Sequence, residues 1–195
     1  MSRFLRCLQL INVLSLTLWA GILVMTGAAA AFTFPTLKGL RLSVAGFAVP
    51  DADQWSLVGG MVAAKFFLVA DIAGYVLGGL ATVSLAILVF RRTSLPPVLN
   101  MSRMHLSARV FTTAVAMCIL CYQLFILGPR MNENLKGYWS NAASGDQPAA
   151  AKFKASFDVD HPQASNVLTA LAVATLAASL AAAWPASRTS IGNDF

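Results

Sequence analysis

Residues 55–90 read WSLVGGMVAAKFFLVADIAGYVLGGLATVSLAILVF, an apolar run with two charges, Lys65 and Asp71, that ends at Arg91. At about 1.5 Å per residue, a continuous helix of this length is roughly 54 Å long. The hydrocarbon core of a bilayer is only about 30 Å thick. The run therefore predicts one transmembrane span, at about residues 67–90, preceded by an extension outside the membrane.

The composition of the whole chain is typical of a membrane protein. Of its 195 residues, 57% are hydrophobic and 11% are charged, and the mean hydropathy is +0.68. A soluble domain usually carries about 25% charged residues. The predicted partner is thus the lipid bilayer, and the net charge of +6 indicates membrane topology, with no nucleic-acid partner expected.

Three further apolar runs predict spans at about residues 8–31, 106–127 and 165–184. The first also resembles a cleavable signal peptide, because basic residues precede it and small residues end it. Its apolar segment of about 24 residues is longer than the usual signal core, which favours a retained span. The polar stretch 130–162 is expected to be an extracytoplasmic loop with a short helix at about 149–157.

Prolines predict where the first and third spans end. Proline cannot donate to the helical hydrogen-bond ladder, and it also restricts the residue before it. Helix ends are therefore expected at Phe34-Pro35 and at Gly128-Pro129. The sequence predicts an all-α fold, a single transmembrane domain over residues 1–195 that forms an integral membrane four-helix bundle with short extracytoplasmic helical segments.

The distribution of basic residues predicts the orientation. Half of the 14 Lys and Arg residues lie in the short segments on the side of the two termini. Short segments are the ones that the positive-inside rule weighs, so both termini are predicted to be cytoplasmic, in a multi-pass protein of the cell (inner) membrane. Arg109, near the start of the third span, is expected to extend to the headgroups.

Asp71 is the first candidate site residue. Counting back about twenty residues from Arg91 places it at the outer rim of the membrane. Acids inside a membrane are costly and usually functional, which suggests a proton or cation site. An ordinary interfacial acid is the alternative, and the position at the rim favours it.

A second candidate is the stretch FDVDHPQASN, which contains Asp158, Asp160 and His161. Carboxylates beside a histidine suit a divalent metal. The alternative is a helix-start cap, with Asp160 or Ser165 accepting from free N–H groups. Met101, Met104 and His105 are weaker candidates for copper, since methionines near a membrane surface more often pack against lipid.

Two further patterns concern packing. Gly74 and Gly78 form a GxxxG pair, which permits close helix approach within a bundle or in a homo-oligomer. Cys118 and Cys121 lie one turn apart in an apolar span, where thiols ionise poorly, so a packing role is expected. The sequence contains no nucleophile triad, phosphate loop or dinucleotide fingerprint, which argues against an enzyme.

Four stretches in order along the chain resemble a known family. They are LWAGILVMTGAAAAFTFPTL, GGMVAAKFF, ILGPRMNENL and FDVDHPQASNVL. The family is the four-span membrane proteins catalogued as domain of unknown function 4149, which include the transmembrane protein 205-like proteins. The resemblance covers roughly residues 8–183, and the polar residues that it implies are Lys65, Pro129, Arg130, Asn132, His161, Ser165 and Asn166.

The resemblance implies four spans and no established activity. A more distant similarity to copper-resistance membrane proteins and to a haem-pathway oxidase implies metal or haem handling. Together, the sequence predicts a non-enzymatic accessory, small-solute or ion-handling membrane component; the alternative is a metal- or haem-binding redox protein. A homo-oligomer or a membrane-complex partner is compatible with both. The predicted outer-face polar cluster consists of Lys65, Asp71, Arg130, Asn132, His161 and Asn166.

Overall fold

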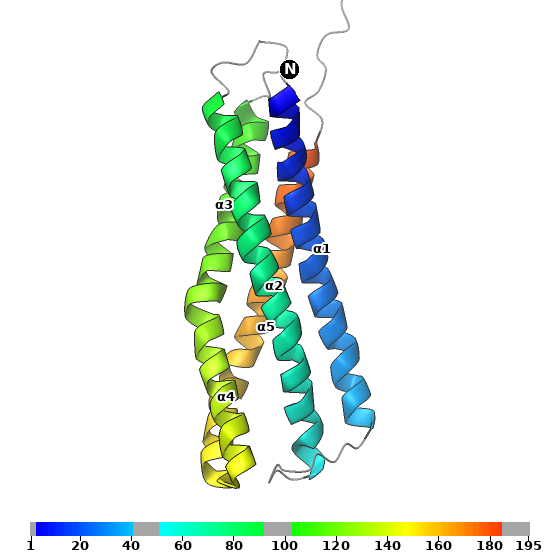
Figure 1. Ribbon diagram of the computed structural model, residues 1–195, viewed down its shortest axis with the longest axis vertical. Coiled ribbons are helices and arrows are strands. Elements are labelled where there is room, and N and C mark those ends of the chain that lie inside the picture. The colour runs from blue at the N-terminus through cyan, green and yellow to red at the C-terminus, as the bar shows by residue number, and fades with distance from the viewer. Residues whose placement is uncertain (1–2, 41–50, 92–102, 185–195) are drawn as a thin grey trace, which may run out of the picture.

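The computed structural model describes residues 3–40, 51–91 and 103–184, and none of these residues lies in a strand. The helices are α1 (Arg3–Gly39), α2 (Asp51–Phe90), α3 (Arg103–Tyr122), the π-helix η3 (Gln123–Leu127), α4 (Gly128–Ser144) and α5 (Gln147–Ala183). Because α3, η3 and α4 continue one another without a break, the described residues form four long rods (Figure 1). The predicted all-α four-helix bundle is confirmed.

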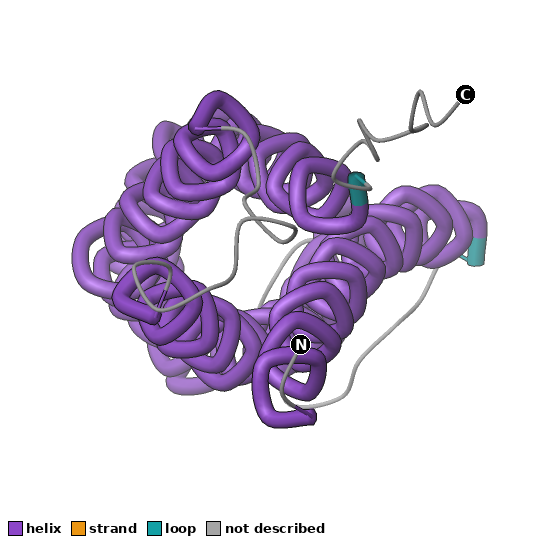
Figure 2. Tube along the Cα trace, turned by 90° about the horizontal axis from the view of Figure 1, so that it is seen from above, coloured by secondary structure: helices purple, strands orange, loops and turns teal. Residues whose placement is uncertain are grey.

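The rods run side by side, and the start of α1 lies at the same end of the bundle as the end of α5 (Figures 1 and 2). α1 packs most extensively on α2, whereas α5 contacts α1, α3 and α4. Each described rod is long and apolar enough to cross a membrane, so the chain is a multi-pass membrane protein. At about 1.5 Å per residue the rods are roughly 55–60 Å long, about twice the hydrocarbon thickness.

Most of the exposed large apolar side chains lie in the half nearer the N-terminus in Figure 1, which we therefore assign to the membrane. They form an apolar belt that falls within the four predicted spans: Leu10, Leu14, Leu18, Val24 and Met25; Leu68, Val69, Ile72, Val76, Leu80 and Val83; Val110, Phe111, Val115, Phe125 and Ile126; Val173, Leu176 and Leu180. Inside the belt, Trp19 and Leu16 are buried at the centre of one core cluster with Leu120 and Leu171.

The other half of the bundle has a separate core. This half, which we call the outer head after the predicted orientation, comprises residues 32–39, 54–66, 128–144 and 147–164. Leu57, Tyr138, Ala142 and Ala150 are buried together there, joining α2, α4 and α5. Lys38 of α1 lies over the Trp55 ring of α2, with the ammonium 5.6 Å from the ring centre.

The prediction of a loop over residues 130–162 is therefore wrong. Within it, only Gly145 and Asp146 lie between helices. Gly145 adopts a left-handed conformation, with φ of 82°, that a residue with a side chain rarely takes. Asp146 then caps α5, because its carboxylate accepts from the Ala149 N–H at 3.1 Å. The chain thus turns directly from α4 into α5.

Both predicted proline ends are also wrong, since Pro35 lies inside α1 and the third rod passes through Pro129. At Pro129 the widened η3 turn makes this continuation feasible. The Gly128 N–H donates to the Gln123 carbonyl, five residues back. A Cβ on Gly128 would lie 2.7 Å from that carbonyl oxygen, so the wide turn requires glycine.

The GxxxG pair is used inside the bundle. Gly74 and Gly78 are buried, and both approach Trp19 of α1. A Cβ on Gly78 would lie 3.1 Å from the Met117 sulfur and 3.3 Å from the Trp19 ring. The pair therefore lets α1 and α3 approach α2 closely.

Replacing Gly78 by leucine is expected to destabilise the bundle, since Trp19 has no room to yield in a filled core. Overpacking costs typically about 1–3 kcal/mol. Gly79→Leu is the matched control, because a Cβ there meets no atom within 4 Å. Thermal unfolding in one detergent should show a lower midpoint for Gly78→Leu only. Equal midpoints would contradict this packing role.

Candidate functional site

A buried arginine links α3 to α1 in the membrane-spanning half. Arg109 is only 2% exposed. Its Nη1 donates to Gln9 Oε1 at 3.0 Å, and its Nη2 donates to Asn12 Oδ1 at 2.7 Å. Gln9 and Asn12 are three residues apart on α1 and so share one helical face. The guanidinium therefore binds two adjacent positions of α1 at once.

The same two amides extend the link to the remaining rods. Asn12 Nδ2 donates to the Ala81 carbonyl of α2 at 2.8 Å and to Ser84 Oγ at 3.3 Å. Gln9 Nε2 donates to the Ala182 carbonyl of α5 at 3.0 Å. Each amide thus accepts from Arg109 through its oxygen and donates to another helix through its nitrogen. This inner polar link joins α1, α2, α3 and α5.

The expectation that Arg109 extends to the headgroups is wrong. A side chain that reached the headgroups would be exposed, whereas Arg109 is buried among helices. A charge inside a membrane protein is costly, and such residues typically face the bundle interior and mark a functional or organising position. Arg109, Gln9, Asn12 and Ser84 are therefore site residues that the sequence reading missed.

One sequence signal could have found this link. Gln9 and Asn12 are amides with i, i+3 spacing in an otherwise apolar span. Arg109 lies near the start of its predicted span, and Ser84 lies within about two turns of the end of its own. Both positions are therefore on the side of the membrane where the first span begins. Polar residues at one depth in neighbouring spans tend to meet, because each needs a partner away from water.

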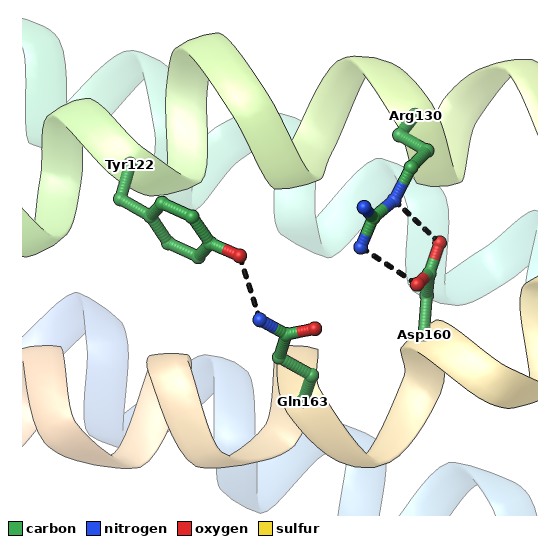
Figure 3. Close-up of polar contacts among 4 residues, drawn as sticks. All are labelled: Tyr122, Arg130, Asp160 and Gln163. Carbon is green, nitrogen blue, oxygen red and sulfur yellow. Dashed lines mark hydrogen bonds and ion pairs between the residues drawn. The ribbon is translucent and has the colours of Figure 1, made fainter.

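The second polar link lies in the outer head, between α4 and α5 (Figure 3). Arg130 Nε donates to Asp160 Oδ2 at 2.8 Å, and Nη2 donates to Oδ1 at 2.7 Å. The carboxylate side chain is 12% exposed and the arginine side chain 49%. This two-point geometry fixes the orientation of both groups, which a single contact does not.

A hydrogen bond between two neutral side chains lies beside this ion pair, on the side toward the membrane-spanning half, where the third rod also faces α5. Gln163 Nε2 donates to the Tyr122 hydroxyl at 2.6 Å, joining α5 to α3 (Figure 3). Gln163 and Asp160 are three residues apart on α5, about 4.5 Å along the helix axis. The third rod therefore contacts α5 at two successive turns of α5, through residues about two turns apart on its own axis.

The structure does not bring the three predicted metal ligands together. Asp158 and Asp160 are two residues apart on a helix, which places them on different faces. Asp160 binds Arg130, and Asp158 accepts from Lys154 at 2.7 Å on the surface. The His161 ring instead lies 5.5 Å from the Phe157 ring. No group of three metal-ligating side chains occurs among the residues that the structure describes.

The six residues of the predicted outer-face cluster lie on three of the rods. Lys65 and Asn132 are exposed, Asp71 is half-buried in α2, and Asn166 is exposed on α5. Within the described ranges, no hydrogen bond or ion pair joins any two of the six predicted members. Arg130 is engaged, but with Asp160, which was assigned to the metal site.

The remaining candidates have simple positions. Met104 is exposed and His105 half-buried, while Met101 lies outside the described residues. Cys118 and Cys121 are exposed on the bundle surface, so the expectation that they pack in the interior is wrong.

Replacing Arg109 by methionine is expected to lower the free energy of unfolding by about 1–3 kcal/mol, because buried amide oxygens lose their donors. Arg91→Met is the control, since Arg91 is exposed just after α2, at the same end of the bundle as Arg109. Its effect should stay within about 0.5 kcal/mol. Thermal or denaturant unfolding measures both, and equal stabilities would contradict a structural role for the inner polar link.

A double-mutant cycle on Arg130→Ala and Asp160→Ala should give a coupling of about 1 kcal/mol, kept modest by the exposure of the arginine. The surface pair Lys154 and Asp158 is the control, for which about 0.3–0.5 kcal/mol is expected. Raising the salt concentration should weaken the control pair more. A coupling no larger than the control would show that the two-point geometry adds nothing.

Comparison with known proteins gives no relative to reason from: no family model, no curated protein and no solved structure matches the chain. The resemblance to the domain of unknown function 4149 family therefore stays a prediction.

Proposed function

We propose that the protein is a non-enzymatic accessory component of the cell (inner) membrane, which anchors in the bilayer and holds the outer head on the extracytoplasmic side. One observation carries this proposal. The outer head has its own buried core and continues the membrane-spanning helices without a flexible joint in the described rods. Such a head is a preorganised surface, which reduces the entropy lost when a partner binds.

The surface of the head suits a protein partner in water. Exposed side chains of both signs lie on α4 and the first half of α5: Arg130, Glu133, Lys136, Lys152 and Asp158. Mixed charges of this kind give orientation and specificity to an encounter more than they give affinity. The ion pair between Arg130 and Asp160 keeps the two helices that carry them in register.

Ion or small-solute handling is the other form of this proposal, and the membrane core favours it less. Trp19 is fully buried and Leu16 is 1% exposed, at the centre of the membrane-spanning half. Leu120 and Leu171 pack in the same cluster. A bulky apolar core of this kind is a barrier to hydrated ions.

The orientation in the proposal has separate support. The described ends of α1 and α5 lie together at one end of the bundle (Figure 1). The short segments at that end contain Arg3, Arg6, Arg91 and Arg103. The positive-inside rule assigns such an end to the cytoplasm, which leaves the outer head outside it.

A photoreactive amino acid in place of Lys136 tests the accessory role in cells. We expect one adduct of discrete mass at this exposed head position, because a docked partner is fixed in place. The matched control replaces Phe111, an exposed member of the apolar belt, and should yield lipid adducts only. The adduct at position 136 should weaken when Asp160→Lys breaks the ion pair with Arg130.

Four results would contradict the proposal. A diffuse crosslinking pattern at position 136 would show that no partner is docked there. Ion flux through proteoliposomes of the pure protein would favour ion or small-solute handling. Stoichiometric metal or haem absorption in the purified protein would favour the redox alternative. A reporter fused at Phe195 that is active only outside the cytoplasm would reverse the orientation.

A further inference from the structure

A groove runs along the seam between α3 and α5. It has a volume of about 440 Å³, is shallow and largely open, and is lined almost entirely by apolar atoms. Its lining residues are Cys118, Ile119, Tyr122, Gln163, Asn166, Val167 and Ala170.

The groove lies in the outer part of the membrane-spanning half. Cys118 and Ile119 belong to the α3 segment of the apolar belt, between the exposed residues Val115 and Phe125. Its open side therefore faces the hydrocarbon region, where the neighbouring molecules are acyl chains. The groove is not a route for water.

The polar groups of the groove gather at its outer end. Tyr122 and Gln163 meet there through the 2.6 Å hydrogen bond, and Asn166 is exposed one turn inward on α5. The Tyr122 hydroxyl accepts from Gln163, so its own hydrogen can be donated to an incoming oxygen. Gln163 Oε1 and the Asn166 amide add further hydrogen-bonding capacity. An apolar channel with one polar end matches an amphiphile.

We propose that this groove binds one acyl chain of a membrane glycerolipid, whose ester oxygens are held by Tyr122, Gln163 and Asn166. The chain lies along Ile119, Val167 and Ala170, in the apolar part of the groove. Arg130 lies beyond the polar end on the same seam, and half of its side chain is exposed (Figure 3). Asp160 holds its Nε and Nη2, so Nη1 is the guanidinium nitrogen left to contact a lipid phosphate.

Two native cysteines and two exposed alanines make the site testable. Cys118 lines the groove, whereas Cys121 is exposed one turn away and does not. Ala170 lines the groove, whereas Ala114 is exposed on α3 outside it. Phenylalanine at either alanine enlarges an exposed position, so the two variants differ in whether they fill the groove.

The experiment uses the full chain in nanodiscs that contain phosphatidylglycerol with a diazirine in the middle of one acyl chain. After photolysis, adducts should concentrate on peptides covering residues 118–122 and 163–170. Ala170→Phe should reduce them about five-fold or more, because the ring displaces one or two methylene groups of the chain, while Ala114→Phe leaves them unchanged.

Adducts spread evenly along the apolar belt, or unchanged in Ala170→Phe, would overturn the proposal. If Ala170→Phe does not fold, Tyr122→Phe decides: it keeps the ring, removes the hydroxyl, and should still lower the adducts about two-fold or more. A second copy of the chain is the rival occupant. Efficient oxidative crosslinking of Cys118 between copies, in the Cys7→Ser and Cys121→Ser background, would show a dimer contact and reject the lipid site.

Discussion

The fork of hydrogen bonds from Arg109 is the interaction on which the membrane-spanning half depends. A guanidinium does not lose its proton in a protein, so a buried one must find oxygen acceptors. Gln9 and Asn12 supply them only if α1 and α3 stand in one register. Apolar packing does not impose this register, because lipid tails are as apolar as leucine. The polar link therefore supplies the specificity of the arrangement.

In the outer head, too, apolar packing fills the core and a polar contact fixes the arrangement of the helices, but the surrounding solvent is water. Its apolar cluster around Leu57 and Tyr138 is buried from water, so the hydrophobic effect contributes directly to its stability. The two-point contact of Arg130 with Asp160 then fixes how α4 meets α5. Between the two polar links lies the core around Trp19. Polar contacts thus hold the helices together toward both ends of the bundle, and apolar side chains pack between them.

Hydropathy and length predicted the bundle well, because a span needs about twenty apolar residues and little else. The predictions failed where geometry, not composition, decides. Proline rules describe a regular ladder, and the η3 turn before Pro129 is not regular. The predicted metal ligands do not converge, because Asp158 and Asp160, two residues apart, point to different sides of a helix. The prediction for Arg109 was wrong because the burial of its side chain depends on how three other helices pack around α3. The sequence of one span does not contain this information.

The η3 turn also sets the angular position of the outer head. A π turn absorbs one residue more than an α turn, so everything after it is displaced by one place in the helical count. One residue corresponds to about 100° of rotation and 1.5 Å of rise. The contact of Arg130 with Asp160 exists only at the present angle. The number of residues between Tyr122 and Arg130 therefore determines how far the outer head is rotated about the helix axis relative to the helices in the membrane.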